Sequence, residues 1–334
     1  MSLRSYFFQA AKLSPFSKWS RILLFYTLLV ILWGAWVRIS HSGDGCGDTW
    51  PLCHGQIIPE AQQHKTWVEF FHRLMSGLFG FFVLGLYFAA RRKFPKAHPV
   101  RKWALLSLIF TFTEALLGAK LVLLRLVADN DTPFRAFFMS LHFINSLMLS
   151  GSLAMTFDFS RFQNLQKRLR SPWSLPSLSI RKTVVAVLFA FVLIGITGAI
   201  AALSSTLFPS SSLLEGLQAD WDPNAHFLIR LRGLHPLSAL LFGGSLALVA
   251  WLSTQLLHAE ETELRLRSQM LTACLALGIS FGILTLLFLA PVWMKLLHLG
   301  IAHGIWIFLL FWIRALRYRP SGSNSPLETR PATS

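Results

Sequence analysis

Four histidines, His72, His142, His235 and His298, occupy matching positions in four long apolar stretches of this sequence. Burying an imidazole in lipid is costly, and ionisable side chains within membrane segments usually serve a function. Counted along the chain, these are the second, fourth, sixth and eighth of the apolar stretches, and each histidine lies near the start of its stretch. Stretches that cross a membrane in the same direction would therefore hold all four histidines at the same depth in it. The four histidines predict two sites that each use a pair of ring nitrogens.

Charged side chains accompany two of these histidines. Glu69 stands three residues before His72 and shares its helix face, where a carboxylate could accept protons or stabilise positive charge. An ion pair with Arg73, four residues further on, is the alternative interpretation. Arg38, Arg73 and Arg232 lie at the ends of apolar stretches. They could bind carboxylates or simply reach toward the membrane interface.

A glycine-rich loop with two cysteines joins the first two apolar stretches. It reads G-D-G-C-G-D-T-W-P-L-C-H-G over residues 43–55, and this composition predicts a tight, structured turn. Cys46 and Cys53 lie seven positions apart on what the topology below makes the outer side of a membrane, where thiols oxidise. We therefore expect them to form a disulfide bond, whereas Cys274 is predicted to be a small core residue.

The elements that must position these residues are long apolar helices. The 334-residue chain is 54% hydrophobic and only 14% charged, which indicates a polytopic membrane protein rather than a water-soluble one. Crossing about 30 Å of hydrocarbon takes roughly 20 helical residues. Eight stretches qualify: 21–40, 69–90, 103–124, 136–157, 183–203, 233–256, 269–290 and 295–316.

The distribution of charge sets the expected orientation. With eight spans, the two termini and the even-to-odd loops share one side, which carries 22 of the 31 Lys and Arg residues but only 5 of the 15 acidic ones. This asymmetry follows the positive-inside rule and predicts a multi-pass protein of the inner (cytoplasmic) membrane with both termini in the cytoplasm. The net charge of +16 therefore reflects the orientation of the protein in the membrane, and we expect no nucleic-acid binding.

The two halves of the sequence repeat one pattern. Phe-Gly follows His72 at +7 and +8 as Phe79-Gly80, and Phe242-Gly243 follows His235 at the same offsets. We expect an all-α fold of eight transmembrane helices in two tandem, pseudo-symmetric four-helix bundles. The expected parts are an N-terminal bundle (1–157), a basic cytoplasmic linker (158–182), a C-terminal bundle (183–316) and a disordered cytoplasmic tail (317–334).

Paired histidines on parallel helices suit one cofactor in particular. Two imidazoles that face each other across a bundle can bind the two axial positions of a haem iron, and the flat macrocycle tolerates apolar surroundings. His303 is the main rival ligand in the last stretch, while the other histidines lie in loops or at segment ends. A zinc site is less favoured because no compact cluster of three or four ligands is present.

Taken together, these residues resemble the haem A synthase family of cytochrome oxidase biogenesis. The resemblance rests on the loop from Gly34 through Cys46 and Cys53, on the sequence Glu69-Phe-Phe-His72-Arg73, and on one histidine in each even helix. It covers about residues 20–316.

The resemblance implies a membrane oxidoreductase. Such an enzyme oxidises a pyrrole methyl group of haem O to a formyl group, which gives haem A for cytochrome oxidase. By position, His72 and His142 would bind the substrate haem in the first half, with Glu69 as a catalytic residue. His235 and His298 would bind a haem b cofactor, and Arg38, Arg73 and Arg232 would contact haem propionates. The implied partners are haem O delivered by a haem O synthase, the lipid bilayer and an electron acceptor of unknown identity; homo-oligomerisation stays open.

Two departures from the family pattern affect these expectations. Pro236 follows His235 where the family usually has arginine, so the second propionate contact is either rebuilt from Arg232 or lost. Glu114 replaces a polar amide in the third stretch, either as a functional carboxylate or as a partner of Lys120 or Arg125. Two rival functions are a non-catalytic dihaem electron carrier, which would not need Glu69, and a haem chaperone or transporter.

Overall fold

A computed structural model describes residues 13–60, 63–161, 178–256 and 262–317. Eight helical spans are long and apolar enough to cross a membrane, and the described residues contain no β-strand, so the predicted fold class is confirmed. The first four are single helices: α2 (Pro15–Ile39), α3 (His64–Lys93), α4 (Pro99–Leu123) and α5 (Pro133–Ser160). The fifth, seventh and eighth are α7 (Leu178–Leu207), α12 (Thr262–Leu287) and α13 (Val292–Arg317).

The sixth span is broken into several pieces. It comprises α9 (Phe227–Arg232), α10 (Leu234–Ser238), a π-helix (Ala239–Gly243) and α11 (Gly244–Leu256). Pro236 has no backbone N–H to donate and cannot sit in a helix interior without disturbing the preceding turn. The corresponding part of α3 contains Arg73 instead and is continuous. The residue that distinguishes the two halves in sequence therefore coincides with the break in helical geometry.

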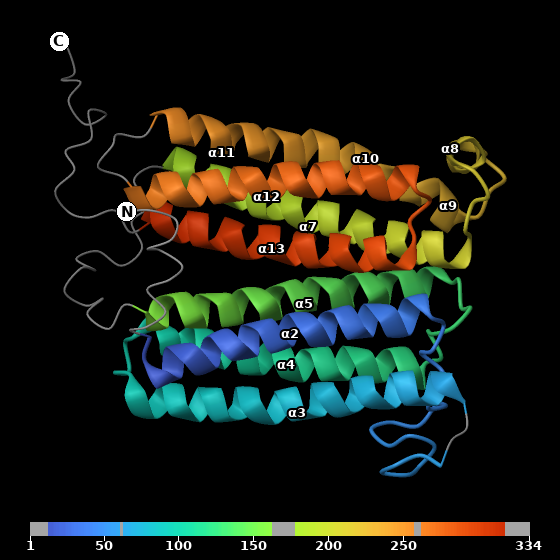
Figure 1. Cartoon of the computed structure of the whole chain (residues 1–334), viewed down its shortest axis with the longest axis horizontal. Helices are drawn as coiled ribbons and strands as arrows, with labels where there is room; N and C mark the ends of the chain where they lie inside the picture. The colour runs from blue at the N-terminus through green and yellow to red at the C-terminus, as the bar shows by residue number, and fades with distance from the viewer. Residues whose placement is uncertain (1–12, 61–62, 162–177, 257–261, 318–334) are drawn as a thin grey trace.

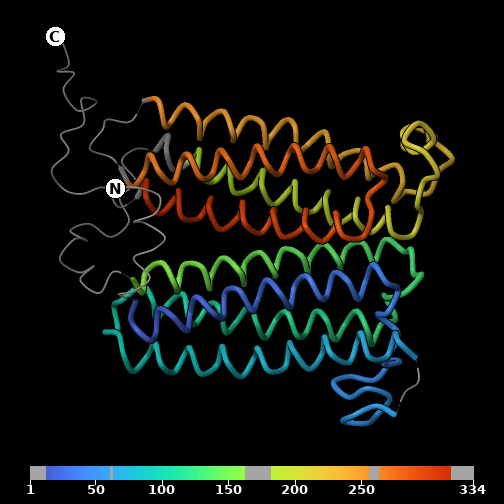
Figure 2. The backbone as a smooth tube through the Cα atoms, in the orientation of Figure 1, coloured from blue at the N-terminus to red at the C-terminus, as the bar shows by residue number. Residues whose placement is uncertain are grey.

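The helices run roughly along the long axis of the molecule and form two groups, one above the other in the view of Figure 1. One group holds α2 to α5, and the other holds α7, the sixth span, α12 and α13. Helix α5 lies at the junction, where it packs against α7 and α13 of the other group. The backbone trace places the loop after α2 and the short helix α8 (Leu213–Trp221) at the same end of the molecule (Figure 2). We call this the loop end, and the opposite end the terminal end.

The helices on either side of the predicted linker reach into its two ends, and the division of the chain into two halves stays a prediction. Helix α5 continues to Ser160 and α7 begins at Leu178, so both ends of the predicted linker (158–182) are helical. Its middle, residues 162–177, lies outside the described residues, as does the predicted tail from residue 318. The helices extend further because Ser160 and Asp158 make buried contacts with other helices.

Local sequence sets where several helices begin. Pro15 and Pro133 occupy the first turns of α2 and α5, where a missing N–H has no helical partner to lose. The preceding Ser14 and Thr132 accept hydrogen bonds from backbone N–H groups of those turns. His98 caps α4 in the same way through its Nδ1 atom, and burial lowers the pKa of this imidazole.

The tightly packed cores lie toward the terminal end of each helix group. In the first group, the buried cluster takes the beginnings of α2 and α4 and the ends of α3 and α5. The second cluster draws in the same way on the ends of α11 and α13 and the beginnings of α7 and α12. The loop-end halves of the helices are therefore free to enclose a space, and the four histidines lie there.

Candidate haem-binding cavity

One large apolar cavity is lined by both helix groups, and in the second group it extends along α7 as far as Thr183. Its volume is about 1680 Å³, and all four predicted histidines line it together with Glu69, Arg38 and Arg73. A typical pocket for one ligand measures about 300–1,000 Å³. This cavity is therefore large enough for more than one bulky group, and it spans the junction between the helix groups.

The first histidine pair comes from α3 and α5. A Cβ atom on Gly34 of α2 would lie 2.9 Å from Cε1 of His72, so the missing side chain gives the imidazole its place. The Nδ1 atom of His72 is buried and has no hydrogen-bond partner among the described residues. Nδ1 of His142 lies 3.2 Å from Oε1 of Glu114, whose other oxygen accepts a 2.5 Å hydrogen bond from Asn145.

The contact between Glu114 and His142 decides a question that the sequence left open. Glu114 does not pair with Lys120 or Arg125: Lys120 lies over the ring of Phe138, and Arg125 pairs with Asp48 in the first loop. A carboxylate at Nδ1 fixes the orientation of an imidazole and directs Nε2 toward a metal. Glu114 is therefore part of the first histidine site.

The second pair, His235 and His298, has the spacing of two axial ligands. Their ring centres lie 6.1 Å apart and their planes are inclined by 77°. Two metal–nitrogen bonds of about 2 Å each, plus two ring radii of about 1 Å, amount to roughly 6 Å. Gly198 and Gly282 provide room for these rings, since a Cβ on either would lie 3.0 Å from Cε1 of the adjacent histidine. The spacing and the ring environment fit a bis-histidine iron.

His303, the rival ligand, lies elsewhere. It is fully buried at the junction of α5 and α13, where its Nδ1 atom is 3.0 Å from the hydroxyl of Ser150 and its ring meets Phe143 edge-on. It does not line the cavity. His298 is therefore the better candidate in α13.

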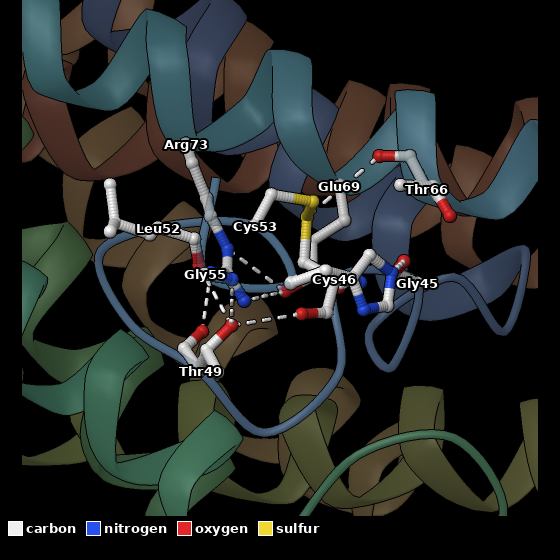
Figure 3. Close-up of polar contacts among 10 residues, drawn as sticks. Gly45, Cys46, Thr49, Leu52, Cys53, Gly55, Thr66, Glu69 and Arg73 are labelled. Carbon is white, nitrogen blue, oxygen red and sulfur yellow. Dashed lines mark hydrogen bonds and ion pairs between the residues drawn. A yellow bond between two sulfur atoms is a disulfide. The ribbon is translucent and has the colours of Figure 1, made fainter. Parts of the chain in front are cut away.

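Glu69 is held at the first site by the cysteine loop (Figure 3). Its Oε2 atom accepts a 2.8 Å hydrogen bond from the backbone N–H of Cys46, and its Oε1 accepts bonds of 3.1 and 2.5 Å from Arg73. Arg73 also donates to the backbone oxygens of Thr49 and Leu52. Glu69 is only 3% exposed. The ion pair considered from the sequence thus forms, and the same carboxylate lines the cavity.

The cysteine loop is an ordered structure. Cys46 and Cys53 form the predicted disulfide bond. Trp50 and Pro51, joined by a cis peptide bond, line the cavity next to this loop. The pair of Asp48 with Arg125 ties the loop to the α4–α5 connection, and this guanidinium lowers the pKa of the Asp48 carboxyl.

The three arginines predicted to bind carboxylates differ in how they are occupied. Arg73 uses its guanidinium on Glu69 and on the two loop oxygens. Arg232 bonds to Asp220 at 2.5 Å and to Ser210, Phe208 and Gly216. Arg38 lines the cavity and donates no hydrogen bond to any residue in the described part of the chain.

Sequence comparisons place the chain in a family. The sequence profile of the cytochrome oxidase assembly protein family matches residues 17–310, which is most of the chain. The chain belongs to this family. The resemblance to haem A synthases noted above is thereby confirmed.

Individual relatives of the family vary in coverage. The chain is 39% identical over 307 residues to a Thermus thermophilus protein named protoheme IX farnesyltransferase, covering 88% of this chain and 48% of that protein. It therefore spans about half the length of that relative. A heme A synthase of Exiguobacterium sp. is 33% identical over 170 residues, or 49% of this chain and 53% of that protein. A heme A synthase of Halalkalibacterium halodurans is 40% identical over 92 residues, 28% of this chain and 31% of that protein.

One cavity residue was not predicted from the sequence. Lys295 of α13 lines the cavity, and its ammonium group donates a 3.1 Å hydrogen bond to the backbone oxygen of Ser205. A signal was available, because Lys295 precedes His298 by three residues, as Glu69 precedes His72. Asn145, which holds Glu114, likewise follows His142 by three residues on the same helix face.

Proposed function

We propose that this chain is a haem A synthase, which oxidises a pyrrole methyl group of haem O to a formyl group. The observation that carries the proposal is the arrangement of two histidine pairs along one apolar cavity, with the buried carboxylate of Glu69 beside the first pair. An electron carrier needs the histidines but not Glu69. The family and its haem A synthase relatives support the same function.

Under this proposal the two pockets have different tasks. His72 and His142 bind the substrate haem, because Glu69 and the disulfide loop stand at this pair alone. His235 and His298 bind haem b, and the 6.1 Å between their rings fits that role. Haem b supplies a redox centre through which electrons leave the substrate pocket. We assign Arg38 to the propionates of the substrate haem because its side chain donates no hydrogen bond to a described residue.

The protein groups around the substrate orient it and accept protons. Converting a methyl group through an alcohol to an aldehyde adds one oxygen atom, which water can supply, and releases protons and electrons. A carboxylate in the pocket can accept the protons, and the electrons pass to an acceptor of unknown identity. Glu69 Oε2 is the better acceptor atom, because its bond comes from a neutral N–H group while Oε1 is held by Arg73. The loop also brings Trp50 and Pro51 to the cavity wall.

We place the protein in the inner (cytoplasmic) membrane, with the loop end outside. The charge asymmetry supports this orientation because the basic residues gather at the terminal end. A disulfide at the loop end agrees with an oxidising exterior. The four histidines then lie toward the outer leaflet.

The Thermus relative's name refers to farnesyl transfer, and we assign that reaction to the part of the relative that this chain does not match. The match leaves out about half of that protein. A chain that carried out both reactions would first transfer a farnesyl group to protohaem and then oxidise the product. Haem O would then pass directly from the first step to the second. For this chain, we propose that a haem O synthase supplies the haem O.

Expression in two bacterial hosts tests the function. One host makes haem O through its own farnesyltransferase, the other makes only protohaem, and neither makes haem A. We expect haem A in pigment extracts of the first host and unchanged protohaem in the second. Bound haem with unconverted haem O would favour an electron carrier or haem chaperone, and new haem O in the second host would show farnesyl transfer.

Replacing Glu69 tests its catalytic role. We expect Glu69→Gln to reduce conversion of haem O by a factor of about 100–10,000, the usual contribution of a general base, while both haems stay bound. Haem A formed per bound haem is the measurement. Glu60→Gln is the matched control, because Glu60 is an exposed carboxylate next to the same loop. Equal turnover of Glu69→Gln and the control would remove the catalytic assignment.

A further inference from the structure

Lys295 occupies a position from which it can act on the second histidine pocket. It lies in the first turn of α13, three residues before His298, so both side chains project from one helix face. Both residues line the cavity. A group bound between His235 and His298 would have Lys295 on its loop-end side.

The charge of Lys295 is not neutralised by the protein. Its one described hydrogen bond goes to the backbone oxygen of Ser205, and no described acidic side chain lies within ion-pair distance. An ammonium group has three N–H donors, so two remain for a ligand. Burying a cation without an anionic partner costs free energy, and this cost would be recovered by an anion in the cavity.

A second cation in the cavity wall also favours binding of an anion there. Arg38, from the other helix group, lies close enough to Lys295 for the two charges to repel each other. Arg38 also lines the cavity and donates no hydrogen bond to a described residue. Two like charges in an apolar cavity are stabilised when carboxylates bind between or beside them. The two cations come from different helix groups, Arg38 from α2 and Lys295 from α13.

Arg232, the residue predicted for this task, is already engaged. Four of its donor bonds go to Asp220, Ser210 and two backbone oxygens around α8. Its ion pair with Asp220 leaves the side chain only 13% exposed. Arg232 thus attaches α8 to the sixth span, much as Arg73 attaches the cysteine loop to α3.

We propose that Lys295 is the carboxylate-binding residue of the second pocket, where it binds a propionate of the haem held by His235 and His298. The inference rests on the proposed haem site but not on any conversion of haem O. It replaces Arg232 by Lys295 as the propionate contact of this half. Arg38 is a second cation in the cavity wall.

The competing explanation is purely structural. Ser205 belongs to the last turn of α7, whose backbone oxygens lack helical partners, and a cation there stabilises the helix end. A lysine with only this role would support folding but would not distinguish a ligand carboxylate from an ester. The two roles therefore separate in a binding experiment.

The experiment compares haem b with its dimethyl ester, which keeps the macrocycle and iron but has no carboxylates. Full-length protein carrying His72→Ala, which leaves only the second pair intact, is titrated with each ligand in detergent. We expect the acid to bind about 10-fold or more tightly than the ester, the usual strength of a charged hydrogen bond. Lys295→Gln should remove most of this preference, and Lys295→Arg should keep it.

Lys120→Gln is the matched control, because Lys120 is a loop-end cation that does not line the cavity. It should keep the preference of the unsubstituted background. Equal loss of acid and ester binding in Lys295→Gln would assign the lysine to helix capping and overturn the proposal. If Lys295→Gln does not fold, equal affinities of the background protein for acid and ester would overturn it instead. Loss of haem A synthesis alone would bear on the proposed function and not on this assignment.

Discussion

The side chain one turn before each histidine differs from one histidine to the next. These residues are Glu69, Met139, Arg232 and Lys295, before His72, His142, His235 and His298 respectively. The first pair therefore has an acid and a thioether beside it, whereas the second has two cations. Because an acid can accept protons and a cation can hold a carboxylate, the pockets differ in chemistry although their ligands match. The side chains beside His72 and His142 are therefore suited to proton transfer, and those beside His235 and His298 are suited to binding a carboxylate.

The Glu114–His142 contact gives a prediction at the same scale. Glu114→Gln removes the negative charge that orients His142, while its amide keeps nearly the same shape. We expect haem in the first pocket to be held about 10–100-fold more weakly, as for other partners of metal-ligating histidines. Haem content and the absorption spectrum of purified protein measure this.

The second pocket is the internal control for this variant, because Nδ1 of His298 has no comparable carboxylate in the described structure. Its haem should be retained unchanged. Full retention of both haems would show that Glu114 does not support His142.

At the scale of elements, glycines in the odd-numbered spans create the space for the imidazoles. Gly34 and Gly198 lie at equivalent positions of α2 and α7, and each faces the histidine of the following span. Gly282 of α12 faces His298 in the same manner. Gly118, at the corresponding place in α4, has no neighbour within 4 Å, because His142 is drawn toward Glu114 instead. The duplicated pattern thus has one deviation, and it lies in the proposed substrate pocket.

This deviation supplies a matched pair of variants. A Cβ atom in Gly282→Ala would lie 3.0 Å from Cε1 of His298 and displace the ring, so we expect loss of the second haem. Gly118→Ala should retain both haems. Its free energy of unfolding should rise by about 0.5–1 kcal/mol, because alanine has less conformational freedom than glycine in the unfolded chain. Haem-to-protein ratios and thermal unfolding of each variant measure the two effects. Loss of haem from both variants alike would contradict this account of the glycines.

On the scale of the whole molecule, a buried ion cluster joins the two helix groups near the terminal end. Asp158 of α5 pairs with Arg267 of α12 and Arg314 of α13, and all three side chains are at most 4% exposed. Trp306 adds a 2.7 Å hydrogen bond from α13 to the backbone oxygen of Leu147. The junction is thus fixed at the terminal end by charge and packing, while at the loop end the cavity crosses it.

Removing the shared acid of this cluster should be costly. Asp158→Asn removes the buried one of the two carboxylates that Arg267 and Arg314 share, and loss of a buried ion-pair partner costs about 3–5 kcal/mol. We expect a clearly lower midpoint in thermal unfolding of the purified protein. Glu263→Gln is the control, because Glu263 contacts the same arginines but is 46% exposed. An equal effect of the two substitutions would show that burial of the cluster does not matter.

Much of this protein was determined by the sequence itself. Span number, the depth of the histidines and the disulfide pair were all predictable, because they depend on composition, spacing and local chain direction. Which side chains meet depends on how each helix is rotated against its neighbours, and only the tertiary structure decides that. It placed Glu114 on His142 rather than on Lys120, engaged Arg232 with Asp220, and left Lys295 facing the cavity. Contacts between distant helices follow from packing of the whole bundle, so no local pattern in the sequence could reveal them.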